Sequence, residues 1–203
     1  MRLRGALADP AVLTERAALR TALHVLPLTT FVADLRRRRG VVPDVDPLDG
    51  GIKARLLLLL ETPGPGSAQL RFVSRDNPTG TAANVRRFCE TAGIARTDMV
   101  LWNTVPWVIH APGARNRPSR RGEIVEGLAE LPAFLALLPR LRVAVLAGRV
   151  AGEARPFLAA VRPELPVLEM PHPSPTFVCT DPAISARIGT ALSEASRVLS
   201  AVR

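Results

Sequence analysis

The chain has 203 residues, of which 47% are hydrophobic and 22% are charged, and its formal net charge at pH 7 is +9. This composition is that of a globular protein and excludes a charge-rich disordered chain, and the length suits one domain around one hydrophobic core. Two cysteines, Cys89 and Cys179, are too few for a disulfide framework or a four-cysteine metal site.

The sequence predicts a soluble protein of the cytoplasm. The N-terminal stretch is interrupted by Arg2, Arg4 and Glu15 and lacks the unbroken apolar region of a signal peptide. The apolar run Leu56–Leu60 is far too short to cross a bilayer. The positive charge suits a protein that approaches phosphate backbones, although Lys53 is the only lysine and the abundance of arginine can also reflect genome base composition.

Two helices and a connection are predicted at the N-terminus. Helical spacing covers residues 11–24 and 31–39, and the second helix ends in four arginines at positions 36–39, before a glycine. We interpret these arginines as solvated groups that complement the helix C-terminus, with a phosphate-binding patch as the alternative. Residues 41–51 (VVPDVDPLDGG) are acidic and rich in proline and glycine, which predicts a linker into the main fold. Residues 1–50 are thus expected to form a helical extension and linker.

Short apolar strands alternate with helices in the rest of the chain. The predicted strands are residues 54–60, 99–103, 141–147 and 167–170. The predicted helices are residues 81–92, 123–138 with an interruption at Pro132, 149–161 and 183–202. Such alternation implies parallel pairing through right-handed crossovers. We therefore expect a single domain, residues 1–203, with three-layer α/β/α architecture and a central four-stranded parallel sheet.

Unusual residues gather where three of the four predicted strands end. Glu61 opens the sequence ETPGPG after the first strand, Asn103 opens NTVPW after the second, and His172 lies in PHPSP after the fourth. Ligands of an open α/β sheet bind outside the carboxyl ends of its strands, so an acid, an amide and an imidazole are expected to converge there. Taken singly, each residue also has an ordinary explanation, as a solvated glutamate, a turn-capping asparagine or a structural histidine.

Together these loops resemble the motifs of the uracil-DNA glycosylase superfamily. Residues 60–64 (LETPG) resemble its first motif, in the form closest to the Gly-Glu-Ala-Pro-Gly of the iron–sulfur branch, and residues 172–175 (HPSP) resemble the second. Residues 145–151 (VLAGRVA) are similar to the glycine-containing strand exit between these motifs. Phe72, followed later by an asparagine at a strand end, also matches in order and spacing. The resemblance covers roughly residues 54–177.

The sequence departs from the family pattern at three points. The iron–sulfur branch has a cysteine near Trp107 and three others elsewhere, and the two cysteines of this chain cannot hold its cluster. Thr62 stands where other branches place Asp or Asn before the proline of the first motif. Tyrosine is absent, so a tyrosine ring cannot exclude thymine as it does in the best-known branch.

The resemblance implies a monofunctional enzyme that cuts uracil from DNA without metal or cofactor, after flipping the nucleotide into a pocket. Phe72 is expected to stack on the base, unless it belongs to the core. Asn103 is expected to read the edge of uracil with its amide, and His172 to donate a hydrogen bond to uracil O2. Glu61 is expected to orient the attacking water, with Asp76 as the alternative carboxylate.

Further residues are expected to approach the substrate. Backbone at Pro63, Gly64 and Gly66 is predicted to lie close to the base, since glycine has no side chain to obstruct it. Ser174 is predicted to bind a DNA phosphate. Thr176 and Phe177 stand where an apolar wedge would enter the duplex, with packing of Phe177 in the core as the alternative. An arginine-rich loop is expected either to bind phosphates or to form solvated surface; its polar residues are Arg115, Asn116, Arg117, Arg120 and Arg121.

The expected partner is uracil-containing DNA, single- or double-stranded, with no membrane association and a monomeric state. Two other functions compete with this prediction. One is a nucleotide or phosphate-ester hydrolase, although the loop after the first strand lacks the lysine and glycine spacing of a P-loop. The other is a damaged-DNA-binding protein that keeps the pocket and has lost turnover, because Thr62 replaces the expected Asp or Asn.

Overall fold

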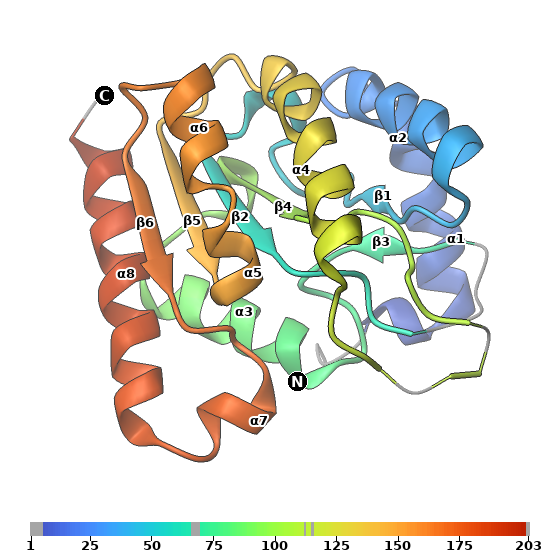
Figure 1. Ribbon diagram of the computed structural model, residues 1–203. Helices are drawn as coiled ribbons and strands as arrows, with labels where there is room; N and C mark the ends of the chain where they lie inside the picture. The colour runs from blue at the N-terminus through green and yellow to red at the C-terminus, as the bar shows by residue number, and fades with distance from the viewer. Residues whose placement is uncertain (1–5, 66–69, 112, 115, 202–203) are drawn as a thin grey trace.

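A four-stranded parallel sheet forms the centre of the protein (Figure 1). The computed structural model describes residues 6–65, 70–111, 113–114 and 116–201. The sheet has the strand order β4-β2-β5-β6, and every neighbouring pair is parallel, which confirms the predicted sheet. Its strands are β2 (Leu56–Leu60), β4 (Met99–Asn103), β5 (Val143–Ala147) and β6 (Val167–Met170).

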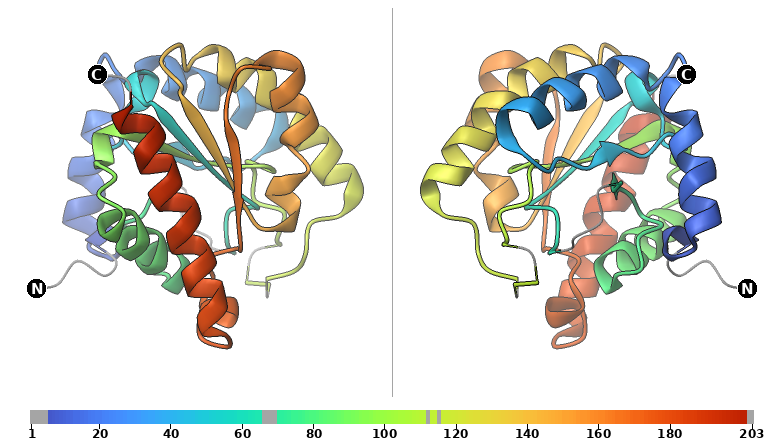
Figure 2. Two further views of the ribbon diagram at one scale, coloured as in Figure 1. Left: turned by 90° about the vertical axis from the view of Figure 1, so that its left-hand side faces the viewer. Right: turned by 90° about the vertical axis from the view of Figure 1, so that its right-hand side faces the viewer.

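Helices cover both faces of this sheet (Figure 2). The helices α3 (Gly80–Thr91) and α8 (Pro182–Ser200) lie on one face. The other face is covered by α4 (Arg121–Ala136), α5 (Arg149–Gly152) and α6 (Arg155–Val161). All residues of β2, β4 and β5 are buried, as expected of strands that are covered on both sides. The predicted three-layer α/β/α architecture is therefore confirmed.

The helices differ from their predicted form in three places. Pro132 does not interrupt α4, because buried Leu128, Leu131 and Leu135 hold the helix against the core on both sides of the proline. The single helix predicted over residues 149–161 is divided into α5 and α6. A short helix that was not predicted, α7 (Pro175–Val178), follows the last strand. No helix in the described part of the chain has the length and apolar character needed to cross a membrane.

The N-terminal segment is part of the packed structure rather than an appended extension. It contains α1 (Pro10–Ala18), α2 (Leu26–Arg39) and the short strand β1 (Asp44–Val45). Strand β1 pairs in parallel with β3 (Phe72–Val73), forming a second, two-stranded sheet that the sequence did not predict. Single-turn 3-10 helices complete the chain at Ala6–Ala8, Leu19–Thr21, Gly51–Lys53 and Arg96–Asp98.

Two of the four arginines that end α2, Arg38 and Arg39, dock this helix onto α4, which corrects their interpretation as solvated groups. Arg38 pairs with Glu130 at 2.6 Å, and Arg39 pairs with Glu126 at 2.6 Å. The guanidinium of Arg39 also lies 4.8 Å from the ring centroid of Trp107. These side chains are engaged within the protein, so they are poor candidates for a phosphate-binding patch.

The acidic stretch before β2 is also not an exposed linker. Asp46 is fully buried and pairs with Arg16 of α1 and with Arg96, both at 2.6 Å. Asp49 is 1% exposed and pairs with Arg96 at 2.9 Å. Because buried charges require partners, these contacts fix α1 to the main fold. We call this group, with Asp76 and Arg86, the buried ion network.

Candidate active site

Glu61 and Asn103 are brought together by the pairing of β2 with β4. Leu60 is the register partner of Asn103, so Glu61 leaves the sheet directly beside the asparagine. The two chains stay joined beyond the strands, because the amide N–H of Thr104 donates to the carbonyl of Leu60 at 2.8 Å and that of Val105 to the carbonyl of Glu61 at 2.9 Å. The acid and the amide therefore share one end of the sheet.

The side-chain amide of Asn103 is available for a ligand. Asn103 is 4% exposed, yet its side chain makes no hydrogen bond to any residue that the structure describes. An amide that serves only to cap a turn would bond the neighbouring backbone. Its free donor and acceptor are instead suited to a flat partner that offers the complementary pattern.

His172 is placed by the loop after β6. The amide N–H of Gly148, at the exit of β5, donates to the carbonyl of Met170 at 2.8 Å and brings the two strand exits together. Asn84 of α3 donates to the carbonyl of Pro173 at 3.0 Å and fixes the loop from the other side. Burial lowers the pKa of His172 below its ordinary 6.5, and the charge of Glu61 opposes this shift. The imidazole is therefore neutral at pH 7 and lies within electrostatic reach of Glu61.

Glu61 is half-buried and keeps one carboxylate oxygen free of protein contacts. The hydroxyl of Ser119 donates to Glu61 Oε1 at 3.0 Å. Within the described part of the chain, Oε2 accepts no hydrogen bond. The carboxylate can thus accept a hydrogen bond from a water molecule.

Asp76, the alternative carboxylate, lies in the buried ion network. Its carboxylate accepts from Arg96 at 2.7 Å and from Arg16 at 3.0 Å, and it also pairs with Arg86. Burial by itself would raise the pKa of Asp76, but hydrogen bonds and charges from these arginines outweigh it and lower the pKa. Both oxygens are occupied, so this geometry favours a structural role for Asp76.

Phe72 is buried but lies outside the main hydrophobic core. It is 3% exposed, and its neighbour Val73 packs in the main core. Because successive side chains of a strand point to opposite faces, the ring of Phe72 faces away from that core. Arg71 donates to the carbonyl of Gly64 at 2.6 Å, which ties β3 to the loop of the first motif. Phe72 is thus a buried residue beside the loop of the first motif, and its stacking on the base stays a prediction.

The loop residues of the first motif differ in their exposure. Pro63 is buried, whereas Gly64 is exposed and has nothing within 4 Å of the position of a Cβ atom. Gly66 lies outside the described residues. The surroundings of Gly64 are open, so a base could lie close to its backbone.

The segment after His172 is exposed at one end of the molecule. Ser174 precedes α7, and Thr176 and Phe177 lie within it. Phe177 is 50% exposed, so the alternative that it packs in the core is wrong. Helix α3 begins against this segment, because a Cβ atom on Gly80 would lie 2.2 Å from Pro175 Cγ.

Arg117, predicted as a DNA contact, is paired within the protein. Its guanidinium donates to Glu123 Oε2 at 2.9 Å and to the carbonyl of Ile109 at 2.8 Å. Arg115 lies outside the described residues, whereas Asn116, Arg120 and Arg121 are exposed. The arginine-rich loop is therefore partly an internal scaffold.

His110 is a buried histidine for which the sequence predicts no role. It is 8% exposed, and neither ring nitrogen has a hydrogen-bond partner among the described residues. Burial lowers its pKa, and the charge of Arg117 adds to this effect. A lone histidine in a loop gives no sequence signal, because its burial depends on how the loop folds back.

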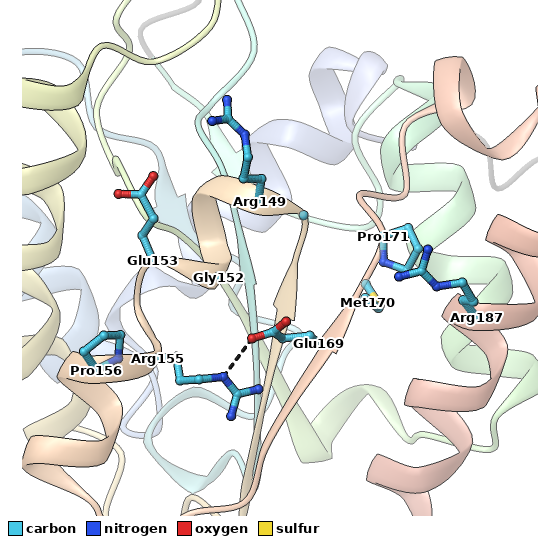
Figure 3. A pocket seen from close by; sticks show the side chains of 10 residues that line it. Arg149, Gly152, Glu153, Arg155, Pro156, Glu169, Met170, Pro171 and Arg187 are labelled. Atoms are coloured by element: carbon cyan, nitrogen blue, oxygen red, sulfur yellow. Dashed lines mark hydrogen bonds and ion pairs between the residues drawn. The ribbon is translucent and has the colours of Figure 1, made fainter.

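A groove of about 600 Å³ runs beside the His172 loop (Figure 3). Arg149 at the start of α5 and Arg187 of α8 are exposed on it, and neither pairs with an acidic group in the described chain. Arg155 pairs with Glu169 at 2.7 Å. The other lining residues are Gly148, Gly152, Glu153, Pro156, Met170 and Pro171. The two free guanidinium groups suit an anionic strand that reaches the site along this groove.

Comparison with known proteins supports the resemblance seen in the motifs. No curated protein matches the sequence. The family model described as "Uracil DNA glycosylase superfamily" matches residues 48–191, more than half of the chain. This range contains Glu61, Asn103 and His172 at the ends of three strands. The chain therefore belongs to the uracil DNA glycosylase superfamily, a family of DNA-repair glycosylases.

Proposed function

We propose that the protein is a monofunctional uracil-DNA glycosylase of the cytoplasm. It binds uracil-containing DNA as a monomer, flips the nucleotide, and hydrolyses the bond between uracil and deoxyribose without metal or cofactor. The observation that carries this proposal is the meeting of Glu61, Asn103 and His172 at one end of the sheet. Among the described residues, no group of three or more potential metal ligands accompanies them.

Base recognition is assigned to Asn103 and Phe72. Uracil has an N3–H donor beside an O4 acceptor, and a carboxamide has the complementary acceptor and donor. Cytosine reverses both positions and would leave polar groups unpaired, at about 1–3 kcal/mol each. Stacking on Phe72 contributes roughly 1–3 kcal/mol, which offsets part of the cost of flipping, about a few kcal/mol.

The chemical step is assigned to His172 and Glu61. As the glycosidic bond breaks, its electron pair leaves with the base, and negative charge grows on uracil O2 and the ring nitrogen. A neutral His172 donates an N–H to O2, an interaction that strengthens in the transition state. Glu61 orients the water that attacks C1′ and accepts its proton. Its carboxylate also stabilises the positive charge that develops on the sugar.

The remaining candidates are assigned to the DNA strand. Ser174 binds a phosphate, and Thr176 and Phe177 on exposed α7 form the wedge that enters the base stack. Backbone at Pro63 and Gly64 approaches the base. The pairing of Arg117 with Glu123 makes Arg117 a support for this surface rather than a primary phosphate ligand.

The test compares two oligonucleotides that differ only in carrying uracil or thymine, incubated with the protein in excess EDTA and then treated with alkali to cleave abasic sites. We expect cleavage of the uracil strand alone. Tight uracil-dependent binding without base release would instead identify a damaged-DNA-binding protein. Base release from free nucleotides but not from DNA would identify a nucleotide hydrolase.

The two carboxylates are separated by a pair of conservative variants. Glu61→Gln should lower the single-turnover rate by about 10²-fold or more while DNA binding survives. Asp76→Asn should mainly destabilise the fold, because it disturbs the buried ion network. If Asp76→Asn remains stable and loses more activity than Glu61→Gln, the assignment of the water to Glu61 is wrong.

A further inference from the structure

Ser119 contacts the carboxylate of Glu61 across the end of the sheet. The serine lies in the segment before α4, 58 positions away in sequence. Its hydroxyl lies 3.0 Å from Glu61 Oε1, and its amide nitrogen lies 3.4 Å from the same oxygen. Only Oε1 is engaged, and no protein donor in the described chain reaches Oε2.

The segment that holds Ser119 is fixed on both sides. Arg117 donates to the carbonyl of Ile109 at 2.8 Å and to Glu123 Oε2 at 2.9 Å. The same Oε2 accepts from the amide N–H of Arg120 at 2.7 Å, at the start of α4. The hydrogen bonds from Arg117 lower the pKa of Glu123 to about 2, so the carboxylate is charged at neutral pH and holds Arg117 and Arg120, which lie on either side of Ser119 in the sequence.

Glutamate has three rotatable side-chain bonds, and a half-exposed carboxylate loses rotamer freedom when it must hold one water. A hydrogen bond to one oxygen restricts the carboxylate before substrate arrives and leaves the other oxygen for the water. Reaction rates are sensitive to displacements of about 1 Å in such groups. Loss of this hydrogen bond is therefore expected to lower the reaction rate as well as to change the local structure.

We propose that Ser119 is a positioning residue for Glu61. It holds Oε1 so that Oε2 is directed at the attacking water, and it does not itself touch the substrate. This inference rests on the proposed role of Glu61 in hydrolysis.

The experiment measures single-turnover excision from a uracil-containing single-stranded oligonucleotide. Ser119→Ala should lower the maximal rate by about 10-fold, as loss of a hydrogen bond to a charged group does, with half-saturating protein concentration unchanged within about twofold. Ser119→Thr keeps a hydroxyl and should keep most of the rate. Ser119→Val has the shape of the threonine variant but lacks the hydroxyl, and it should behave like Ser119→Ala. Ser196→Ala, at a half-buried serine near the end of α8, is the matched control and should change nothing.

A double-mutant cycle shows whether Ser119 acts through Glu61. In a Glu61→Gln background, adding Ser119→Ala should change the rate by no more than about twofold, because the group that it positions is already lost. A merely structural serine would lower the rate in both backgrounds, and that result overturns the inference. Thermal unfolding identifies any variant that fails to fold, and the Thr and Val pair then decides the outcome.

The two proposals fail in different ways. If Glu61→Gln is impaired and Ser119→Ala and Ser119→Val keep the parent rate, only the positioning role is wrong. If Glu61→Gln keeps the parent rate, the assignment of Glu61 is wrong and the role of Ser119 is overturned with it.

Discussion

Gly148 and His172 pack so closely that a Cβ atom on Gly148 would lie 2.9 Å from the Cβ of His172. Gly148 also has a φ angle of +89°, which residues with a side chain rarely adopt. The glycine at the exit of β5 therefore sets the position of the imidazole that follows β6. Gly148 thereby helps to position the His172 N–H that is proposed to donate to uracil O2.

Gly148→Ala should displace His172 and lower the single-turnover excision rate by about 10-fold or more, because the donor to uracil O2 moves out of line. Gly189→Ala on α8 is the matched control, since nothing lies within 4 Å of its added Cβ atom. The rates and the melting temperatures of both variants check this prediction. A Gly148→Ala protein that is folded and fully active would show that the close packing does not position His172.

Asn103→Ala should lower uracil excision by roughly 10- to 100-fold, because both hydrogen bonds to the base edge are lost. Asn103→Asp is sharper, since a carboxylate cannot donate to uracil O4 but can accept from the exocyclic amine of cytosine. The uracil-to-cytosine rate ratio, measured in single-stranded oligonucleotides of the same sequence, should fall. Folded variants with the parent rate and ratio would make Asn103 a structural residue only.

Arg187→Gln should weaken DNA binding without changing the maximal rate of excision. Each phosphate contact in a single strand contributes about 0.7 to the slope of log affinity against log salt concentration, so the slope should decrease by about that amount. Binding titrations at several salt concentrations measure it. Arg140→Gln is the control, because this exposed arginine precedes β5 at the opposite end of the sheet. Equal effects of both variants would assign the change to net charge rather than to the groove.

Arg16→Leu should lower the free energy of unfolding by about 3–5 kcal/mol, because it leaves buried Asp46 and Asp76 without one of their partners. Arg37→Leu removes an exposed pair with Asp34 and should cost less than about 1 kcal/mol. Urea denaturation measures both variants. Similar, small losses would mean that the N-terminal segment contributes little to the stability of the fold.

The sequence by itself determined the sheet and the convergence of the site. Continuous apolar runs, alternating with helical periodicity, place β2, β4, β5 and β6 in one parallel sheet, and parallel strands direct their carboxyl ends to the same edge. Asn103 ends β4, and Glu61 and His172 lie within two residues of the ends of β2 and β6, so their placement at one edge follows from topology and needs no knowledge of side-chain packing. The fold class could therefore be predicted from local patterns, and the family from the resemblance of the loops to its motifs.

Only the tertiary structure decided the roles of the charged residues. The segment VVPDVDPLDGG has the composition of a solvated linker, yet its aspartates are buried because Arg16 and Arg96 reach them from distant parts of the chain. The sequence offers Asp76 as the alternative carboxylate and Arg117 as a DNA contact, whereas the structure shows both residues in ion pairs. Ser119 gave no signal at all, because its contact with Glu61 depends on the path of a loop. Charges and hydroxyls are satisfied by partners that are close in space, and a sequence records only which partners are close along the chain.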